Sequence, residues 1–205
     1  EVNMTRGVMF HLSGLADTAV KESYDRIKAA IENNGFKSPT AEITINLSPA
    51  DIRKEGTGYD LPLAIGMLAA DEVIKTDDLD RYIIMGELSL DGSLHPIKGV
   101  LPIAIKAREQ GYKGFILPRE NAREAAIVDR LLVYGADNIK EVIDFLNGTS
   151  AIPPTVVDTR AEFARHAIES DLDFADVKGQ ESVKRALEVA AAGGHNIIMV
   201  GPPGA

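Results

Sequence analysis

The fold is decided by one stretch of sequence: Lys54-Glu55-Gly56-Thr57-Gly58-Tyr59-Asp60, followed at once by Leu61-Pro62-Leu63-Ala64-Ile65-Gly66-Met67-Leu68-Ala69-Ala70. A glycine-bearing loop leads here into a segment that is apolar almost all round, which predicts a buried helix over residues 61–70. Asp60 is expected to cap this helix, and Pro62 is tolerated in its first turn. The rest of the domain is expected to pack around it.

The flanking sequence predicts both strands and helices. Upstream, strands are expected over 8–15 and 42–47, and Val20, Tyr24, Ile27 and Ile31 form one apolar helical stripe. Downstream, the segments 82–88 and 93–97 flank Asp91-Gly92, which is a hairpin signal. Further helices are expected over 101–110, 122–128 and 139–146, and strands over 114–117 and 131–134. The fold class is therefore α+β, a mixed sheet with packed helices.

Composition excludes several classes of protein. The chain has 205 residues, a net charge of −9 and no cysteine. Disulfide frameworks, thiolate metal sites and cysteine nucleophiles are thereby excluded. The four histidines lack metal-like spacing, so no metal site is expected. The negative charge argues against a globally basic nucleic-acid-binding surface. No apolar run reaches the length of a membrane helix, and a cytoplasmic protein without membrane partners is expected.

The last third of the chain changes character. Ile152-Pro153-Pro154 marks a linker over residues 149–172, after which a helix over 181–192 and a strand over 196–200 are expected. Gly201-Pro202-Pro203-Gly204-Ala205 then supplies the first five positions of the phosphate-binding loop G-x-x-x-x-G-K-[ST]. A plain turn after a strand is the alternative. The lysine that reaches the β- and γ-phosphates would come next, so the piece itself is expected to bind neither ATP nor Mg²⁺.

Several long stretches resemble one family. They are Gly14-Leu15-Ala16-Asp17-Thr18-Ala19-Val20-Lys21-Glu22-Ser23, the loop 54–62, Gly86-Glu87-Leu88-Ser89-Leu90-Asp91-Gly92, Asn121-Ala122-Arg123-Glu124-Ala125, and Asp173 to Gly204. Together they are similar to the magnesium-chelatase-like AAA+ ATPases of the YifB/ComM family. Ala16 departs from the family, which more often has proline at this turn.

The resemblance implies an architecture and a function. Residues 1–148 would be an accessory domain, cut at its N-terminus, with the fold of the Lon protease domain and of domain 2 of ribosomal protein S5. Residues 173–205 would begin an α/β P-loop AAA+ domain, cut within its phosphate loop. Such proteins are expected to form hexameric rings, hydrolyse ATP with Mg²⁺, and act on DNA, including branch migration during natural transformation. The resemblance places eight residues at the nucleotide: Val177, Gly179, Gln180, Gly201, Pro202, Pro203, Gly204 and Ala205.

A peptidase is the sharpest rival for the first domain. In Lon-like enzymes a serine and a neutral lysine form the catalytic pair. Gly58 stands at the position that matches the serine, and Leu101 at the position that matches the lysine. Thr57, Lys98 and Lys106 are neighbours, but a shift of one residue redirects a side chain. We therefore expect no catalytic residues in this domain. A partner-binding scaffold remains the main alternative function, and a porphyrin magnesium-chelatase subunit is less favoured.

Overall fold

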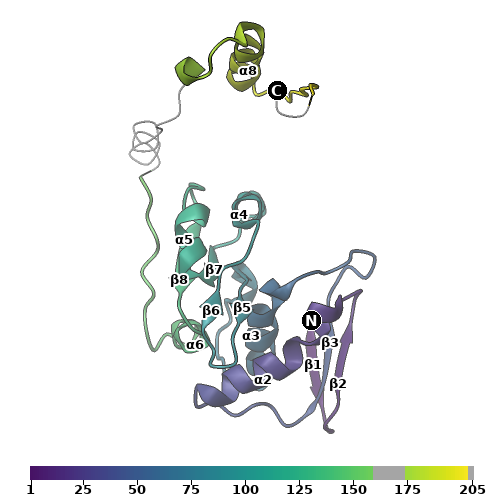
Figure 1. Cartoon of the computed structure of the whole chain (residues 1–205). Helices are drawn as coiled ribbons and strands as arrows, with labels where there is room; N and C mark the ends of the chain where they lie inside the picture. Colours follow the sequence, from purple (N-terminus) through teal and green to yellow (C-terminus); the bar gives the residue numbers. More distant parts are fainter. Residues whose placement is uncertain (159–173, 203–205) are drawn as a thin grey trace. The chain divides into compact units, whose positions relative to one another are not determined.

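A computed structural model describes residues 1–158 and 174–202 (Figure 1). These residues belong to two compact units, Glu1–Asp158 and Thr159–Ala205, and each is described by itself. The strands of the first unit are β1 (Val2–Thr5), β2 (Phe10–Ser13), β3 (Glu42–Asn46), β4 (Tyr82–Ile84), β5 (Glu87–Leu88), β6 (Leu94–His95), β7 (Gly114–Pro118) and β8 (Leu132–Ala136). Its α-helices are α1 (Thr18–Lys21), α2 (Ser23–Asn33), α3 (Asp60–Ala70), α4 (Val100–Glu109), α5 (Arg119–Ala125) and α6 (Ile139–Leu146).

Two sheets of the first unit carry different pairings. One has the order β1-β3-β2, with β3 antiparallel to β1 and parallel to β2. The other has the order β4-β7-β8 and is wholly parallel. Strand β5 forms a short antiparallel hairpin with β6, around the turn at Gly92. The mixed α+β class predicted from the sequence is confirmed.

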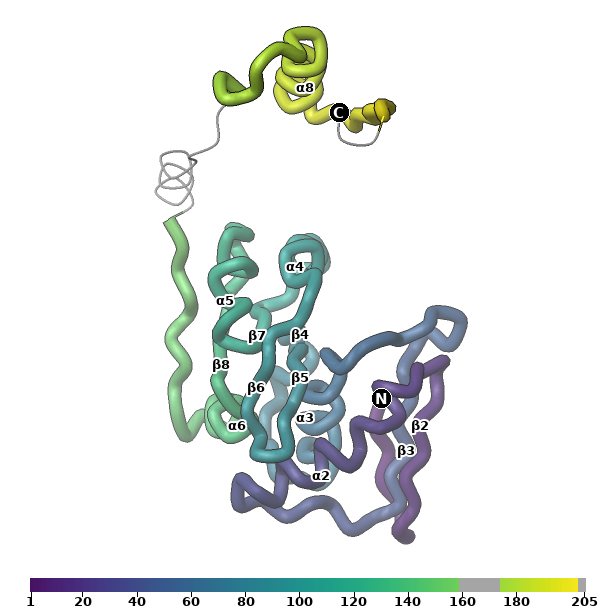
Figure 2. The backbone as a smooth tube through the Cα atoms, viewed as in Figure 1, coloured from purple at the N-terminus to yellow at the C-terminus, as the bar shows by residue number. Residues whose placement is uncertain are grey.

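The parallel sheet is covered on both faces, which explains why every residue of β7 is buried. Side chains of a strand alternate between its faces. Phe115 and Leu117 accordingly pack in a cluster with α4 and α5, whereas Ile116 packs in the larger cluster with α2, α3 and α6. The tube in Figure 2 shows α4 and α5 lying close to β7 and β8. Two hydrophobic clusters thus lie on opposite faces of one sheet.

Helix α3 lies at the centre of the larger cluster, as its apolar sequence predicts. Seven of its eleven residues are buried, among them Leu61, Met67 and Leu68. It packs against α2, whose residues Ile27 and Ile31 are fully buried, and against β1. The predicted apolar stripe runs on into α1 through the fully buried Val20. Residues 60–70 therefore supply the centre of the core.

Three sequence predictions about the first unit were wrong in detail. The strand predicted over 82–88 is divided at Gly86, whose N–H donates a hydrogen bond to the carbonyl of Gly58. As a result, β4 belongs to the parallel sheet, and only β5 belongs to the hairpin. The helix expected over 122–128 is α5, which begins at Arg119. Asp60 does not cap α3: it is the first helical residue, and its carboxylate pairs with Arg26.

The second unit has less regular structure than its sequence predicts. It contains a 3₁₀ turn, η3 (Phe174–Asp176), and the predicted helix, α8 (Glu181–Gly193). The strand expected over 196–200 is absent; Ile198 and Val200 are 87% and 93% exposed. A strand is stabilised by hydrogen bonds to a neighbour, and residues 174–202 provide none for this segment. In residues 1–158 and 174–202, no helix is long and apolar enough to cross a membrane.

The turn at Gly14 supplies a test of backbone packing. Its φ is +102°, and a Cβ there would clash with the backbone carbonyl oxygen of Leu47. Gly14→Ala is expected to lower the free energy of unfolding by about 2 kcal/mol, since it adds a backbone clash to the cost of positive φ. Gly111 has a φ of +77° with nothing within 4 Å of a Cβ. Gly111→Ala should therefore cost only about 1 kcal/mol in urea unfolding, and equal losses would contradict the packing argument.

Candidate functional site

One candidate site is a cavity of about 450 Å³ in the second unit. It brings together residues that are distant in sequence: Val177 and Gln180 come before α8, and Gly201 and Pro202 come after it. These are four of the eight residues that the sequence assigns to a nucleotide. The remaining lining residues are Phe174, Val183, Lys184, Leu187, Met199 and Val200.

The loop before α8 owes its shape to two consecutive left-handed residues. Gly179 has a φ of +75° and Gln180 a φ of +58°. This bend starts the helix and places Val177 and Gln180 at the cavity, whereas Gly179 does not line it. Gly179 therefore contributes backbone shape to the site. Pro203, Gly204 and Ala205, the other three predicted residues, lie outside the described residues.

The chemistry of this cavity suits binding rather than catalysis. Most of its lining is aliphatic or aromatic, and its one charged group is Lys184. The Lys184 ammonium donates to the carbonyl of Val177 at 3.1 Å and lies 2.7 Å from a carboxylate oxygen of Glu181. Within the described part of the chain, no group of three or more His, Asp or Glu side chains could hold a metal ion. An apolar cavity with a few polar groups is typical of sites that bind small organic molecules.

A second candidate site lies at the loop before α3. A cavity of about 300 Å³ is lined there by residues 55–59, Met85, Glu87 and residues 96–98. The Thr57 hydroxyl donates a hydrogen bond to the carboxylate of Glu87. Lys98 lines the same cavity, whereas Lys106 forms an ion pair with Glu109 at 3.0 Å. The Thr57 hydroxyl therefore has a carboxylate as its hydrogen-bond partner, and no amine of the described residues is bonded to it.

The two positions that match a serine–lysine pair carry no reactive group. A Cβ on Gly58 would lie 3.3 Å from Cγ2 of Ile97 and 3.5 Å from Cε of Met85, so the space for a serine is already tight. Leu101 packs at the edge of the cluster with α4 and α5. A hydroxyl nucleophile needs a neighbouring base to be activated. The site offers a small cavity without that arrangement.

We expect that the chain does not hydrolyse casein or an activated ester. The reason is that the Thr57 hydroxyl donates to the carboxylate of Glu87, which is a much weaker base than the neutral lysine amine of a serine–lysine pair. Thr57→Ala is the matched control, because it removes the only hydroxyl of the loop 54–58. Turnover by the parent chain that disappears in Thr57→Ala would show that the pair has been replaced by neighbouring residues.

An ion pair beneath this loop is a feature that the sequence did not reveal. Asp60 is fully buried and accepts two hydrogen bonds of 2.9 Å from Arg26, and a third of 3.3 Å from the N–H of Leu88. Burial raises the pKa of the Asp60 carboxyl, and the hydrogen bonds from Arg26 oppose that rise. The bond to Asp60 raises the pKa of Arg26. The pair fixes α2 to α3 and β5, next to the cavity.

Comparisons with known proteins identify the family to which the chain belongs. A family model described as "Subunit ChlI of Mg-chelatase" matches residues 1–121, and one described as "Magnesium chelatase, subunit ChlI" matches residues 173–205. These matches place the chain among magnesium-chelatase-like proteins. The chain is 40% identical over its whole length to the competence protein ComM of Haemophilus influenzae, and 41% identical to YifB of Escherichia coli, covering 40% and 39% of those proteins. It therefore belongs to the magnesium-chelatase-like YifB/ComM family.

More distant relatives match only part of the chain. Lon protease 2 of Bacillus subtilis is 29% identical over 126 residues, which is 60% of this chain and 22% of that protein. The relatives that match the chain over its whole length are longer proteins, and the chain spans about 40% of their length. The activity of a whole protein in this family is consequently a matter for proposal.

Proposed function

We propose that the second unit begins an ATP-binding module, and that the chain is part of an ATPase that remodels DNA. The observation that carries this proposal is the cavity in which Val177 and Gln180 meet Gly201 and Pro202. A ring-binding cavity beside the start of a glycine-containing loop is the arrangement that a nucleotide requires. Membership of the family supports the same reading.

The residues divide between the two ends of a nucleotide. Val177 and Gln180 would contact the base, and Gly179 would shape the loop that carries them. The Lys184 ammonium holds the carbonyl of Val177 in place. Gly201, Pro202, Pro203, Gly204 and Ala205 would begin the loop around the phosphates, whose backbone N–H groups suit anionic oxygens. ATP with Mg²⁺, when bound, supplies the phosphoryl group for hydrolysis. This chain's own part is to bind and orient the base.

For the first unit we propose a Lon-protease-like fold that has kept its shape without catalysis. The partial match to Lon proteases and the replacement of the reactive pair by Gly58 and Leu101 support this. Its role would be accessory: to assemble the whole protein into a hexameric ring or to bind a partner. The name of one relative, a competence protein, supports a role connected with competence. We propose branch migration of DNA as the reaction and the cytoplasm as its location.

The test uses the full-length protein in which this chain is followed by the rest of its ATPase. It should hydrolyse ATP, and a four-way DNA junction should raise the rate at least tenfold over linear duplex of the same length. Continuation of the sequence after Ala205 with Gly-Lys-Ser or Gly-Lys-Thr is the corresponding check on the phosphate loop. If branched DNA did not stimulate ATP hydrolysis, the proposed DNA remodelling would be wrong, but the proposed ATPase activity would stand. If the sequence continued after Ala205 with other residues, both proposals would be wrong.

A further inference from the structure

The parallel sheet of the first unit has two edges, of which one is covered by a further segment of chain and the other is not. Along β8, the extended residues 151–158 cover the edge: the N–H of Thr155 donates to the carbonyl of Val133 at 2.8 Å, and Ile152 is buried. At the opposite edge, β4 pairs with β7 alone among the described strands. Proteins usually cover or disrupt such edges, because an open one invites a further strand.

Hydrogen bonds already made by β4 and its neighbours show which backbone groups face outward. The N–H of Lys113 donates to the carbonyl of Arg81, and the N–H of Met85 donates to the carbonyl of Ile116. The backbone groups of residues 81 and 85 therefore point toward β7. Backbone direction alternates along a strand, and Tyr82 and Ile84 therefore face away from β7. The N–H of Tyr82 is bonded to the carbonyl of Leu79. Among the described residues, nothing bonds the carbonyl of Tyr82 or the N–H and carbonyl of Ile84, so these three groups are available to a partner.

The loop before α3 already pairs with one end of the open edge of β4. Gly86, the next outward-facing residue, donates to the carbonyl of Gly58 at 3.0 Å and accepts from the N–H of Leu61 at 3.0 Å. The line of β4 is thus already paired at one end by an irregular piece of chain. A segment bound at Ile84 would extend a pairing that the fold has begun.

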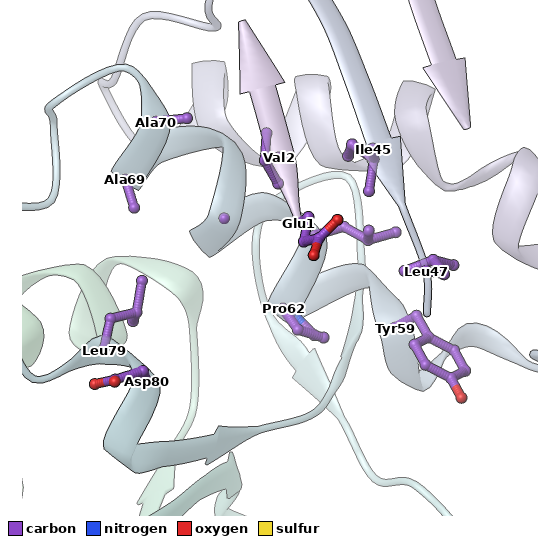
Figure 3. A pocket seen from close by; sticks show the side chains of 12 residues that line it. Glu1, Val2, Ile45, Leu47, Tyr59, Pro62, Ala69, Ala70, Leu79 and Asp80 are labelled. Carbon is purple, nitrogen blue, oxygen red and sulfur yellow. The ribbon is translucent and has the colours of Figure 1, made fainter. Parts of the chain in front are cut away.

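A groove runs beside the open edge, and we call it the β4 groove. Its central cavity, of about 340 Å³, is lined by residues 82–85 together with Tyr59, Pro62, Asp80 and Tyr112. Tyr59, Pro62 and Asp80 also line a cavity of about 630 Å³ between α3 and β1, which Figure 3 shows with Val2, Ile45 and Leu79 around it. Tyr59 and Met85 are shared with the cavity at Thr57. Adjoining apolar cavities of this kind accept side chains.

The charge of the β4 groove is mainly acidic. Asp80 is exposed at the centre, and no cation pairs with it in the part of the chain that the structure describes. Glu55 and Glu87 lie at the end near Thr57, where Lys98 is the one basic lining residue. The whole chain carries a net charge of −9. An occupant that carries basic side chains is therefore favoured, and an acidic one is repelled.

We propose that the β4 groove binds an extended, basic peptide segment of a partner protein, which adds to the sheet as a strand beside β4. One peptide residue exchanges hydrogen bonds with the N–H and carbonyl of Ile84. Its apolar side chains enter the cavities on either side of Tyr59, and a lysine or arginine meets Asp80. Peptide backbone bonds give such binding its affinity, and alternate side chains give it specificity. The β4 groove belongs to the first unit, and this proposal does not depend on nucleotide binding by the second unit.

The test uses the chain of residues 1–205 and a fluorescent, capped peptide with the sequence lysine-valine-threonine-valine-lysine. Saturable binding is expected below about 1 mM in fluorescence anisotropy. A peptide with methylated valine amides keeps every side chain and loses donors, so it should bind at least tenfold more weakly. Glutamate in place of both lysines should weaken binding similarly. Hydrogen exchange at the Ile84 amide should slow at least tenfold at saturation, while exchange at Ile116 stays unchanged.

A pair of matched variants separates the groove from general charge. Asp80→Lys should weaken peptide binding about fivefold, and Asp129→Lys, an exposed carboxylate outside the groove, should leave it unchanged. Equal binding of the methylated peptide, or no binding at 1 mM, would overturn the proposal. So would slowing of Ile84 exchange when protein concentration alone is raised, because a second copy of the chain would then be the partner of β4.

Discussion

Arg26→Met is expected to lower the free energy of unfolding of the first unit by about 3–5 kcal/mol. The substitution removes both 2.9 Å bonds to Asp60, whose side chain has no exposed surface. The carboxylate keeps only the bond from the N–H of Leu88, and a buried charge without its counter-ion is costly. Urea unfolding followed by circular dichroism measures the loss.

The pH dependence of this loss has a definite sign. Burial raises the pKa of Asp60 above its ordinary value of 3.8, and loss of Arg26 removes the main opposing effect. The folded variant then binds a proton more tightly than the unfolded chain, so its stability falls as pH rises from 3.8 through the raised pKa. The deficit of Arg26→Met relative to the parent chain should therefore be smaller at pH 5 than at pH 8.

Two further variants decide whether the buried charge is the cause. Lys28→Met, an exposed basic residue on the same helix, should change stability by no more than about 0.5 kcal/mol. Arg26→Met combined with Asp60→Leu removes both charges and should recover most of the loss. A double variant as unstable as Arg26→Met alone would show that packing of the arginine stem, and not its charge, carries the effect.

Val177→Asp in the full-length protein should raise the Kd for ATP at least about a hundredfold, which is about 2.7 kcal/mol. The carboxylate would lie in the apolar cavity, where a bound base would remove its hydration, and it would repel the phosphates of the same ligand. Lys184, the one nearby cation, is already bonded to the carbonyl of Val177 and paired with Glu181. Binding of a fluorescent ATP analogue measures the change.

Arg185→Asp provides the matched control for this prediction. It introduces the same carboxylate on α8, at a side chain that is 75% exposed and does not line the cavity. The Kd should then stay within about threefold of the parent value, since exposed charges interact weakly. If both variants weakened binding equally, the apolar cavity would not be where the base binds.

Local patterns in the sequence predict most elements of the first unit, because each depends on neighbours along the chain. The apolar run of α3, the turn at Gly92 and the stripe through Val20 and Ile27 all lie where they were expected. The role of Asp60 could not be predicted from neighbouring residues. An acidic residue before a helix favours a cap, but the partner that the fold supplies, Arg26, lies 34 residues away.

The candidate sites depend still more on distant pairing. Sequence resemblance selects Val177 and Gly201, and only the fold brings them to one cavity. The open edge of β4 cannot be predicted from residues 82–84, which have the same apolar character as a central strand. It follows from the strand order, in which β7 lies between β4 and β8. The failed strand over 196–200 has the same origin, since its pairing partner is not among the described residues.

The hydrogen bond from Thr155 to Val133 also has a mechanical consequence. Tension applied to the chain beyond Asp158 reaches the first unit through this bond and the buried side chain of Ile152, before it reaches α6. These contacts lie in sequence along one strip, so they would peel away one at a time under a small force. The end of the first unit can thus lengthen before load reaches α6, and Ile152 is the first residue of the hydrophobic core that is pulled.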